Sequence, residues 1–297
     1  MEFAFALGAA LLFAVASVLQ QRAASEAPGK ETLHPGLMWH LVRRPMWLVG
    51  YVADWIAFGL QALALGAGSL LVVQPLLVTG LLFSLPFSAR WSGRRLGRHD
   101  WIAAIALCAG LGSFLLLGNP TGGRNRAPFV DWAIAGGVVA GIGAVAVVLA
   151  RRRRGAPRAT LLALATGVAY GLTAGLTKTS VSLLGDGLVA FFTHWEPYAL
   201  VVFASGGMWL NQAAFQAGEL KASLPALDVG EQIVAATIGV TVLKEHLQAH
   251  GALDWFLILL ALAAMVYGVV VLSVRAAETS EALPPDVPVK PPVLPLL

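Results

Sequence analysis

The sequence predicts an all-α polytopic membrane protein, and three observations support this fold class. Apolar residues make up 58% of the chain, and 12% of the residues are charged, whereas soluble domains carry about 25% charged residues. The mean hydropathy is +0.75. Apolar stretches long enough to cross a bilayer recur along the whole chain. We therefore do not expect two soluble domains, although the length of 297 residues would allow them.

Nine stretches have the roughly 20 mostly apolar residues that a transmembrane helix needs. They cover residues 2–22, 46–67, 69–90, 99–118, 129–150, 160–183, 197–216, 220–242 and 253–274. The second stretch passes into the third at Gly66-Ala67-Gly68, so we expect a tight helical hairpin there. The first stretch begins with Glu2 instead of a positively charged segment, which predicts a permanent span and not a signal peptide.

The positive charges predict how these spans are oriented. Sixteen Lys and Arg residues fall in or beside the loops that follow odd-numbered spans, and three fall on the opposite side. Since basic loops face the cytoplasm, the N-terminus is expected outside and the C-terminus inside the cytoplasmic membrane. The clusters Arg90–Arg98 and Arg151–Arg158 then face anionic lipid headgroups, and no nucleic-acid partner is expected. Residues 30–44 predict a surface-lying amphipathic helix.

The two halves of the chain resemble each other. With an offset of 150 residues, Leu60-Gln61 aligns with Leu210-Asn211 and Pro75 with Pro225. The first span aligns at a slightly larger offset, which places Gln21 on Lys178. Because five spans separate equivalent elements, the two copies must have opposite topology. Such inverted repeats are typical of secondary transporters, whose substrate site lies near the midplane of the membrane.

This repeat predicts the domain organisation. We expect a first transmembrane repeat over 1–118, a linking helix with a basic cytoplasmic loop over 119–159, a second transmembrane repeat over 160–275, and a disordered cytoplasmic tail over 276–297. Small residues also predict close contacts between helices. Gly167, Gly171 and Gly175 share one face of the sixth span, and Gly137 and Gly141 share one face of the fifth.

Ionisable residues at membrane depth are candidates for function, since inserting each one costs about 3 kcal/mol. Asp228 and Glu231 are three residues apart and share one helix face. Two such carboxylates in a medium of low dielectric do not easily ionise together, so one can exchange a proton with a substrate. Alternatively, both could bind a cation, or both could form a structural ion pair with Lys178. Asp54 lies in the middle of its span, and Lys178 lies late in its span, where it could snorkel to the headgroups.

Uncharged polar residues and prolines complete the candidate pathway. The amides that could line it, or could join helices by hydrogen bonds, are Gln61, Gln74, Asn211 and Gln212. Pro75 and Pro225 could break their helices and free carbonyl groups for ligands. Glu245 stands at a helix end, where we expect it to be a cap or exposed.

A resemblance to a known family is carried by residues in both halves. They are Trp47–Gly50, Gln74-Pro75, Gly110 and Gly112 in the first half, and Lys178, Leu210-Asn211, Pro225 and Lys244-Glu245 in the second. With these residues and its nine-span layout, the chain resembles the drug/metabolite transporter superfamily over about residues 5–275. It is most similar to the NIPA-type magnesium transporter branch. The resemblance implies nine spans with a fifth linking helix, transport activity, and Mg²⁺ as the substrate.

Three departures from the pattern of that branch concern acidic residues. The branch carries a Gly-Glu pair in the second span, where this chain has Ala57-Phe58, with Asp54 one turn earlier. Arg90-Trp91 stands where the branch has an acidic residue at the end of the third span. Asp228 and Glu231 have no acidic counterparts in the branch. The resemblance therefore implies the fold, and it leaves the magnesium specificity open.

Together these features predict a secondary transporter that moves a small solute or an inorganic cation by alternating access. The open alternatives are a proton-coupled drug or metabolite exporter, a non-transporting scaffold subunit, and an intramembrane enzyme that would rely on Asp228 and Glu231. No enzyme activity and no cofactor are expected, because the sequence contains no catalytic or metal-binding motif. Cys108 lies in an apolar run and is expected to be buried and inert. The expected partners are the lipid bilayer and the solute, and a homodimer is left open.

Overall fold

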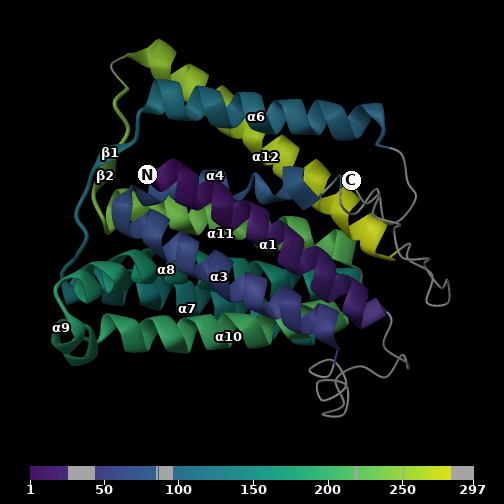
Figure 1. The fold of residues 1–297 in the computed structure, drawn as a ribbon, viewed down its shortest axis with the longest axis horizontal. Helices are drawn as coiled ribbons and strands as arrows, with labels where there is room; N and C mark the ends of the chain where they lie inside the picture. Colours follow the sequence, from purple (N-terminus) through teal and green to yellow (C-terminus); the bar gives the residue numbers. More distant parts are fainter. Residues whose placement is uncertain (26–43, 85, 87–95, 218–219, 250, 282–297) are drawn as a thin grey trace, which may run out of the picture.

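The computed structural model describes residues 1–25, 44–84, 86, 96–217, 220–249 and 251–281, which form a bundle of helices (Figure 1). The helices are α1 (Glu2–Ser25), α3 (Pro45–Ala67), α4 (Leu70–Leu77), α6 (Arg98–Gly118), α7 (Phe129–Arg151), α8 (Ala156–Gly185), α9 (Leu188–Thr193), α10 (Glu196–Ala217), α11 (Leu220–Thr241) and α12 (Ala252–Glu281). Two short strands, β1 (Thr121–Gly122) and β2 (Glu245–His246), pair antiparallel.

The helices coincide in position with the predicted apolar stretches. Among the described residues, α1, α3, α6, α7, α8 and α12 are long and apolar enough to cross a membrane. Helices α10 and α11 have 22 residues each, but amides and carboxylates make them less apolar. The chain is therefore an all-α protein that is embedded in a membrane.

Local sequence signals explain where several helices begin and end. Pro45 opens α3 at a position where the missing N–H has no helical partner to lose. The Ser69 hydroxyl accepts a hydrogen bond from the N–H of Val72 (3.1 Å) and caps α4. The Asp100 carboxylate accepts the N–H of Gly97 (2.8 Å) at the start of α6, and that helix ends at Asn119 in the left-handed region, with a φ of 34°.

The predicted third span, residues 69–90, is not one continuous helix. Helix α4 ends two residues after Pro75, and a turn at Val78–Thr79 precedes a further helical stretch over 80–84. Proline lacks the N–H that would continue the helical ladder, which weakens the helix at this point. Helix α11, by contrast, runs through Pro225 without interruption.

Two predictions about the loops and the tail have different outcomes. The amphipathic helix expected over 30–44 falls almost entirely outside the described residues. The tail was expected to lack structure from residue 276, but α12 continues to Glu281. Its last turns carry helix-forming Ala and Glu residues, and the Pro-rich segment begins only after them. Residues 282–297 lie outside the described part of the chain.

Helix α8 lies at the centre of the bundle. Of its membrane-spanning window, 72% is buried inside the protein, against 17% for α7. It packs against α7, α10 and α11 and also touches α3 and α4. Helix α1 packs mainly against α3, and α6 packs mainly against α12. Residues on α8 are therefore the ones most sheltered from lipid.

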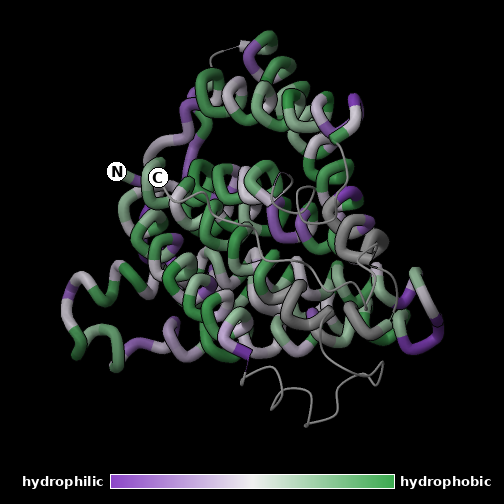
Figure 2. Tube along the Cα trace, turned by 45° about the vertical axis from the view of Figure 1, so that its right-hand side comes forward, coloured by the Kyte–Doolittle hydropathy of each residue, from purple (hydrophilic) through white to green (hydrophobic). Residues whose placement is uncertain are grey.

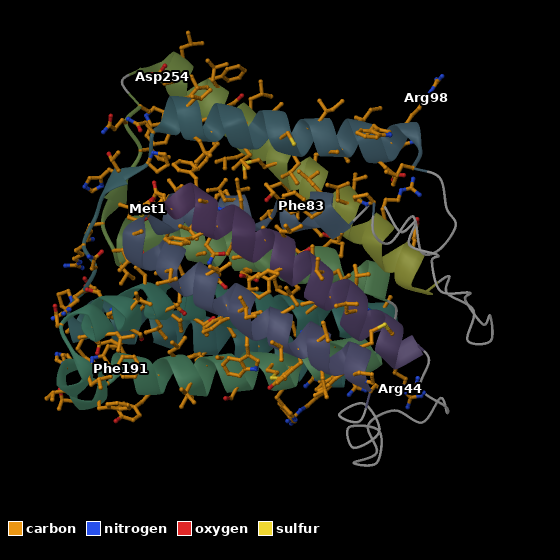
Figure 3. The ribbon with its side chains drawn as sticks, in the orientation of Figure 1. Met1, Arg44, Phe83, Arg98, Phe191 and Asp254 are labelled. Atoms are coloured by element: carbon orange, nitrogen blue, oxygen red, sulfur yellow. The ribbon has the colours of Figure 1, made fainter. Side chains whose placement is uncertain are left out.

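The bundle has two chemically different ends. Met1, Phe191 and Asp254 lie at one end, and Arg44 and Arg98 lie at the other (Figure 3). We call these the Met1 end and the Arg44 end. Hydrophobic residues dominate the helices, whereas hydrophilic residues are concentrated near the helix ends and turns (Figure 2). This distribution is the one expected for a protein surrounded by lipid along its sides.

The glycine face of α8 makes the closest helix contact in the interior. A Cβ atom placed on Gly167 would lie 2.3 Å from the carbonyl oxygen of Leu227 in α11, and one on Gly171 would lie 2.7 Å from that of Glu231. Gly175 packs in the same way against Ile238. The prediction of close packing at these three glycines is confirmed.

Two other packing predictions were wrong. Gly137 and Gly141 lie on an exposed face of α7, with no atom within 4 Å of an added Cβ. Helix α7 instead buries Trp132 and Val139. Cys108 was expected to be buried, but it is exposed on the outer face of α6. In a membrane protein an apolar stretch is apolar all round, so hydropathy does not say which side faces lipid.

The glycine contact yields a stability prediction. In Gly171→Ala, the added methyl group would meet the α11 backbone, and overpacking of this kind costs about 1–3 kcal/mol. We therefore expect a lower Tm for this variant in detergent solution. The control is Gly141→Ala, which has open space and gains helix propensity, so its Tm should be unchanged or slightly raised. Equal Tm values for the two variants would contradict the close α8–α11 contact.

Candidate functional site

A group of polar side chains surrounds Tyr170 in the middle of α8. The Tyr170 hydroxyl is within hydrogen-bonding reach of the Asn211 side chain on α10 and interacts electrostatically with the carboxylates of Glu231 on α11 and Asp54 on α3. All four side chains are half-buried. Four helices thus converge on one polar region near the middle of the bundle. Placing a charged group at this depth costs free energy, so these residues are candidates for function.

Asp228 adds a third carboxylate to this region. It lies close enough to Glu231 for the two charges to repel each other, as expected for residues one helical turn apart. The hydroxyl of Ser273 on α12 donates a hydrogen bond to Oδ2 of Asp228. We call Asp54, Tyr170, Asn211, Asp228 and Glu231 the carboxylate cluster.

The glycine face of α8 positions this cluster. Gly167 lies against the backbone N–H of Glu231, and Gly171 lies against the Glu231 carbonyl group. At Gly207 of α10, an added Cβ would lie 2.7 Å from the Tyr170 ring. Since only glycine allows such close approaches, these positions set how near the carboxylates lie to the tyrosine.

Among the described residues, no basic side chain pairs with the acidic side chains of the cluster. Within the described part of the chain, no salt bridge reaches Asp54, Asp228 or Glu231. The described residues also include no group of three or more His, Cys, Asp or Glu side chains that could hold a metal ion as they stand. The arrangement therefore offers negative charge, one aromatic ring and an amide to a positively charged ligand.

Lys178 is paired away from the cluster. Its Nζ lies 2.6 Å from Oε1 of Glu245, and the side chains of Lys178 and Glu245 are 5% and 0% exposed. The alternatives that Lys178 pairs with Asp228 and Glu231, or snorkels to the headgroups, are therefore wrong. The buried partner Glu245 satisfies the ammonium group inside the protein.

Glu245 has a second role that the sequence did not reveal. Its Oε1 accepts the N–H of Leu70 (2.7 Å), and its Oε2 accepts the N–H of Leu71 (2.9 Å). The carboxylate thus caps the N-terminus of α4, some 175 residues away in the sequence. We expected Glu245 to be a local cap or exposed, and sequence distance hid this partner.

The remaining candidates are found in different surroundings. Gln61 is buried on α3. Gln74 is 1% exposed on α4, and neither of its amide atoms has a partner among the described residues. The Asn211 oxygen likewise has no partner there. The side chain of Gln212 lies outside the described residues. Of the predicted set, the structure brings Asp54, Asn211, Asp228 and Glu231 into one region. Gln74 lies on α4, and Lys178 pairs with Glu245.

Sequence reasoning missed Tyr170 and Ser273 as members of the site. Each is a hydroxyl in the middle or late part of an apolar span. Tyr170 also stands between Gly167 and Gly171, on the helix with the most closely packed glycine face. A polar side chain within a glycine-rich span was therefore the signal that would have pointed to it.

Comparison with known proteins gives one informative relative. No protein-family model matches the chain, and no solved structure matches it. The chain is 34% identical over 283 residues to the uncharacterized protein Cgl0250/cg0304 of Corynebacterium glutamicum, covering 94% of this chain and 96% of that protein. Identity at this level over nearly the full length of both proteins means that this chain belongs to the same family as the C. glutamicum protein.

Proposed function

We propose that the chain is a secondary transporter that moves a small cationic solute across the cytoplasmic membrane by alternating access. The observation that carries this proposal is the carboxylate cluster, where Glu231 and Asp54 both interact electrostatically with Tyr170 and Asp228 interacts with Glu231, inside a membrane-embedded bundle. Charges at membrane depth are costly and commonly mark ion or substrate pathways. A site with several acidic side chains attracts a cation.

The proposed fold is nine spans arranged as two inverted repeats joined by a linking helix, as in the drug/metabolite transporter superfamily and its NIPA-type branch. Equivalent contacts in the two halves support this. In the first half Gly80 packs on Ala10, and in the second half Gly230 packs near Gly167. These residues correspond at the same offsets that align the two halves in the sequence.

The position of the cluster fits a site between the two repeats. Asp54 comes from the first half, whereas Tyr170, Asn211 and Glu231 come from the second. Helices of the two halves meet where α3 contacts α8 and where α4 contacts α11. Inverted-repeat transporters bind their substrates at such an interface.

Mg²⁺ and an organic cation are the two kinds of solute that this site suits. Mg²⁺ requires nearly octahedral oxygen ligands, which the carboxylates and the Asn211 oxygen would supply after a rearrangement. An organic cation needs only negative charge and an aromatic surface, such as Tyr170 provides. The neighbouring Asp228 and Glu231 favour exchange of a proton for the solute, because both cannot easily be ionised together.

Transport by purified protein in liposomes tests the proposal. We would measure Mg²⁺ entry with a Mg²⁺ dye, and proton movement with a pH dye after adding choline, spermidine or tetraphenylphosphonium. Asp228→Asn and Glu231→Gln should each lower the initial rate roughly tenfold or more, since a nearby charge contributes about 1–4 kcal/mol.

Asp186→Asn is the matched control for these variants. Asp186 pairs with Arg126 and is largely exposed, so the same chemical change there should leave transport intact. Wild-type rates in Asp228→Asn and Glu231→Gln would show that the cluster is not the site. Absence of flux for every probe with the wild-type protein would favour the scaffold alternative.

The orientation is tested separately by cysteine labelling. In a Cys108→Ala background, Asn125→Cys lies in the β1–α7 loop and Arg153→Cys lies between α7 and α8. We expect a membrane-impermeant thiol reagent added to intact cells to label the first variant only, because basic loops remain in the cytoplasm. Labelling of Arg153→Cys alone would reverse the proposed topology, and equal labelling of both would remove α7 as a span.

A further inference from the structure

Four leucines are fully buried on the Met1 side of the carboxylate cluster (Figure 1). Leu65 of α3, Leu70 of α4, Leu176 of α8 and Leu243 after α11 are all at most 1% exposed. They come from four different parts of the chain and pack into one hydrophobic core.

The buried pair of Lys178 and Glu245 lies beside these leucines, since the N–H of Leu70 donates to Glu245 and Leu176 precedes Lys178 by two residues. Lys178 follows Tyr170 by eight residues on α8, which places it about 12 Å further toward the Met1 end. The Glu245 carboxylate holds the ammonium group of Lys178 and the first two N–H groups of α4 at once. One side chain thus joins α8, α4 and the segment after α11.

Stability alone does not explain an ion pair in this position. A fully buried pair gains little over apolar side chains of similar size, because both charges must be removed from water. The best-attested use of such pairs is to select one arrangement among alternatives. Separation of this pair would let water return to both charges, which would offset part of the lost attraction between them.

Helix α4 is suited to move with this pair. It has eight residues, and helices of that length are marginal without outside contacts. Its N-terminus is held by Ser69 and Glu245, and a turn at Val78–Thr79 separates it from the helical stretch that follows. Release of Glu245 would therefore free a short rigid element instead of a whole transmembrane helix.

We propose that the Lys178–Glu245 pair is the lock of a gate at the Met1 end, and that the gate opens when Glu245 and the N-terminus of α4 separate from Lys178. This inference rests on the proposed function, because a gate matters only if the carboxylate cluster must reach both sides of the membrane. Lys178 and Glu245 act on the position of α4 and do not bind the solute themselves.

A disulfide beside the gate provides the first test, because it ties the chain four residues before Leu70 to α8 and so restrains the N-terminus of α4. An ideal Cβ on Gly66, at the end of α3, lies 3.6 Å from the Cβ of Val181, one turn beyond Lys178 on α8, and disulfides need about 3.5–4.5 Å. In a Cys108→Ala background, the oxidised Gly66→Cys/Val181→Cys protein should lose at least tenfold in transport, and reduction should restore it.

The two single-cysteine variants are the matched controls, and oxidation should leave their transport unchanged. The cross-link preserves the closed structure, so loss of activity cannot be attributed to unfolding. Full transport by the oxidised double variant, with the disulfide confirmed by mass spectrometry, would overturn the proposal.

Thiol accessibility gives a second test that does not depend on transport. Thr177 is buried beside Lys178, and Thr177→Cys should react slowly with an impermeant reagent applied from the side that labels Asn125→Cys. Lys178→Met or Glu245→Gln should speed this reaction at least tenfold, whereas Lys178→Arg should not. An unchanged rate in folded variants with a normal elution volume would overturn the gate.

The two tests separate the two proposals. If no probe is transported by the wild-type protein but the lock variants open Thr177→Cys to reagent, the gate stands and the proposed transport function fails. If transport is present and the oxidised pair and the lock variants behave as wild type, the gate fails and the transport function stands.

Discussion

The contact between α8 and α11 is the constraint on which the rest of this structure depends. Gly167 and Gly171 let the two backbones approach so closely that any side chain would collide with a carbonyl group. This contact fixes Glu231 beside Tyr170 and keeps Asp228 within reach of Ser273. Toward the Met1 end the same two helices lead to Lys178 and to the segment that carries Glu245. The polar cluster and the buried ion pair are therefore positioned by one apolar, glycine-lined surface.

The charged side chains inside the bundle form two groups, one paired and one without a basic partner among the described residues. Lys178 and Glu245 neutralise each other, and backbone N–H groups satisfy the remaining acceptor capacity of the carboxylate. Asp54, Asp228 and Glu231 have no basic partner in the described part of the chain. A charge inside a membrane is tolerated when it is paired, hydrated or offered to a ligand. The paired charges thus suit a structural switch, and the unpaired ones suit a binding site.

Much of the fold was predictable from the sequence because hydropathy sets where helices form in a membrane. The positions of most long helices, the tight connection between α3 and α4, and the glycine face of α8 followed from composition and spacing, whereas the turn that ends α4 did not. The sequence could not predict which face of each helix points to lipid, as Cys108 and Gly141 demonstrate, because lipid and the protein interior are both apolar. The partner of Lys178 was missed for a related reason, since Glu245 caps a helix that is close only in the folded chain.

The two ends of the bundle need not close by the same chemistry. Under the proposed repeat, Gln21 is equivalent to Lys178, and Arg90-Trp91 stands at the end of the third span, where the second half has Lys244-Glu245. An amide and a guanidinium group cannot form the ion pair that joins α8 to α4, because neither carries a negative charge. The first half therefore does not repeat the Lys-Glu pair of the proposed lock, which favours the arrangement closed at the Met1 end. A solute that binds the carboxylate cluster must offset this preference before the site opens to the Met1 end, because a ligand shifts a two-state equilibrium only by its difference in affinity for the two states.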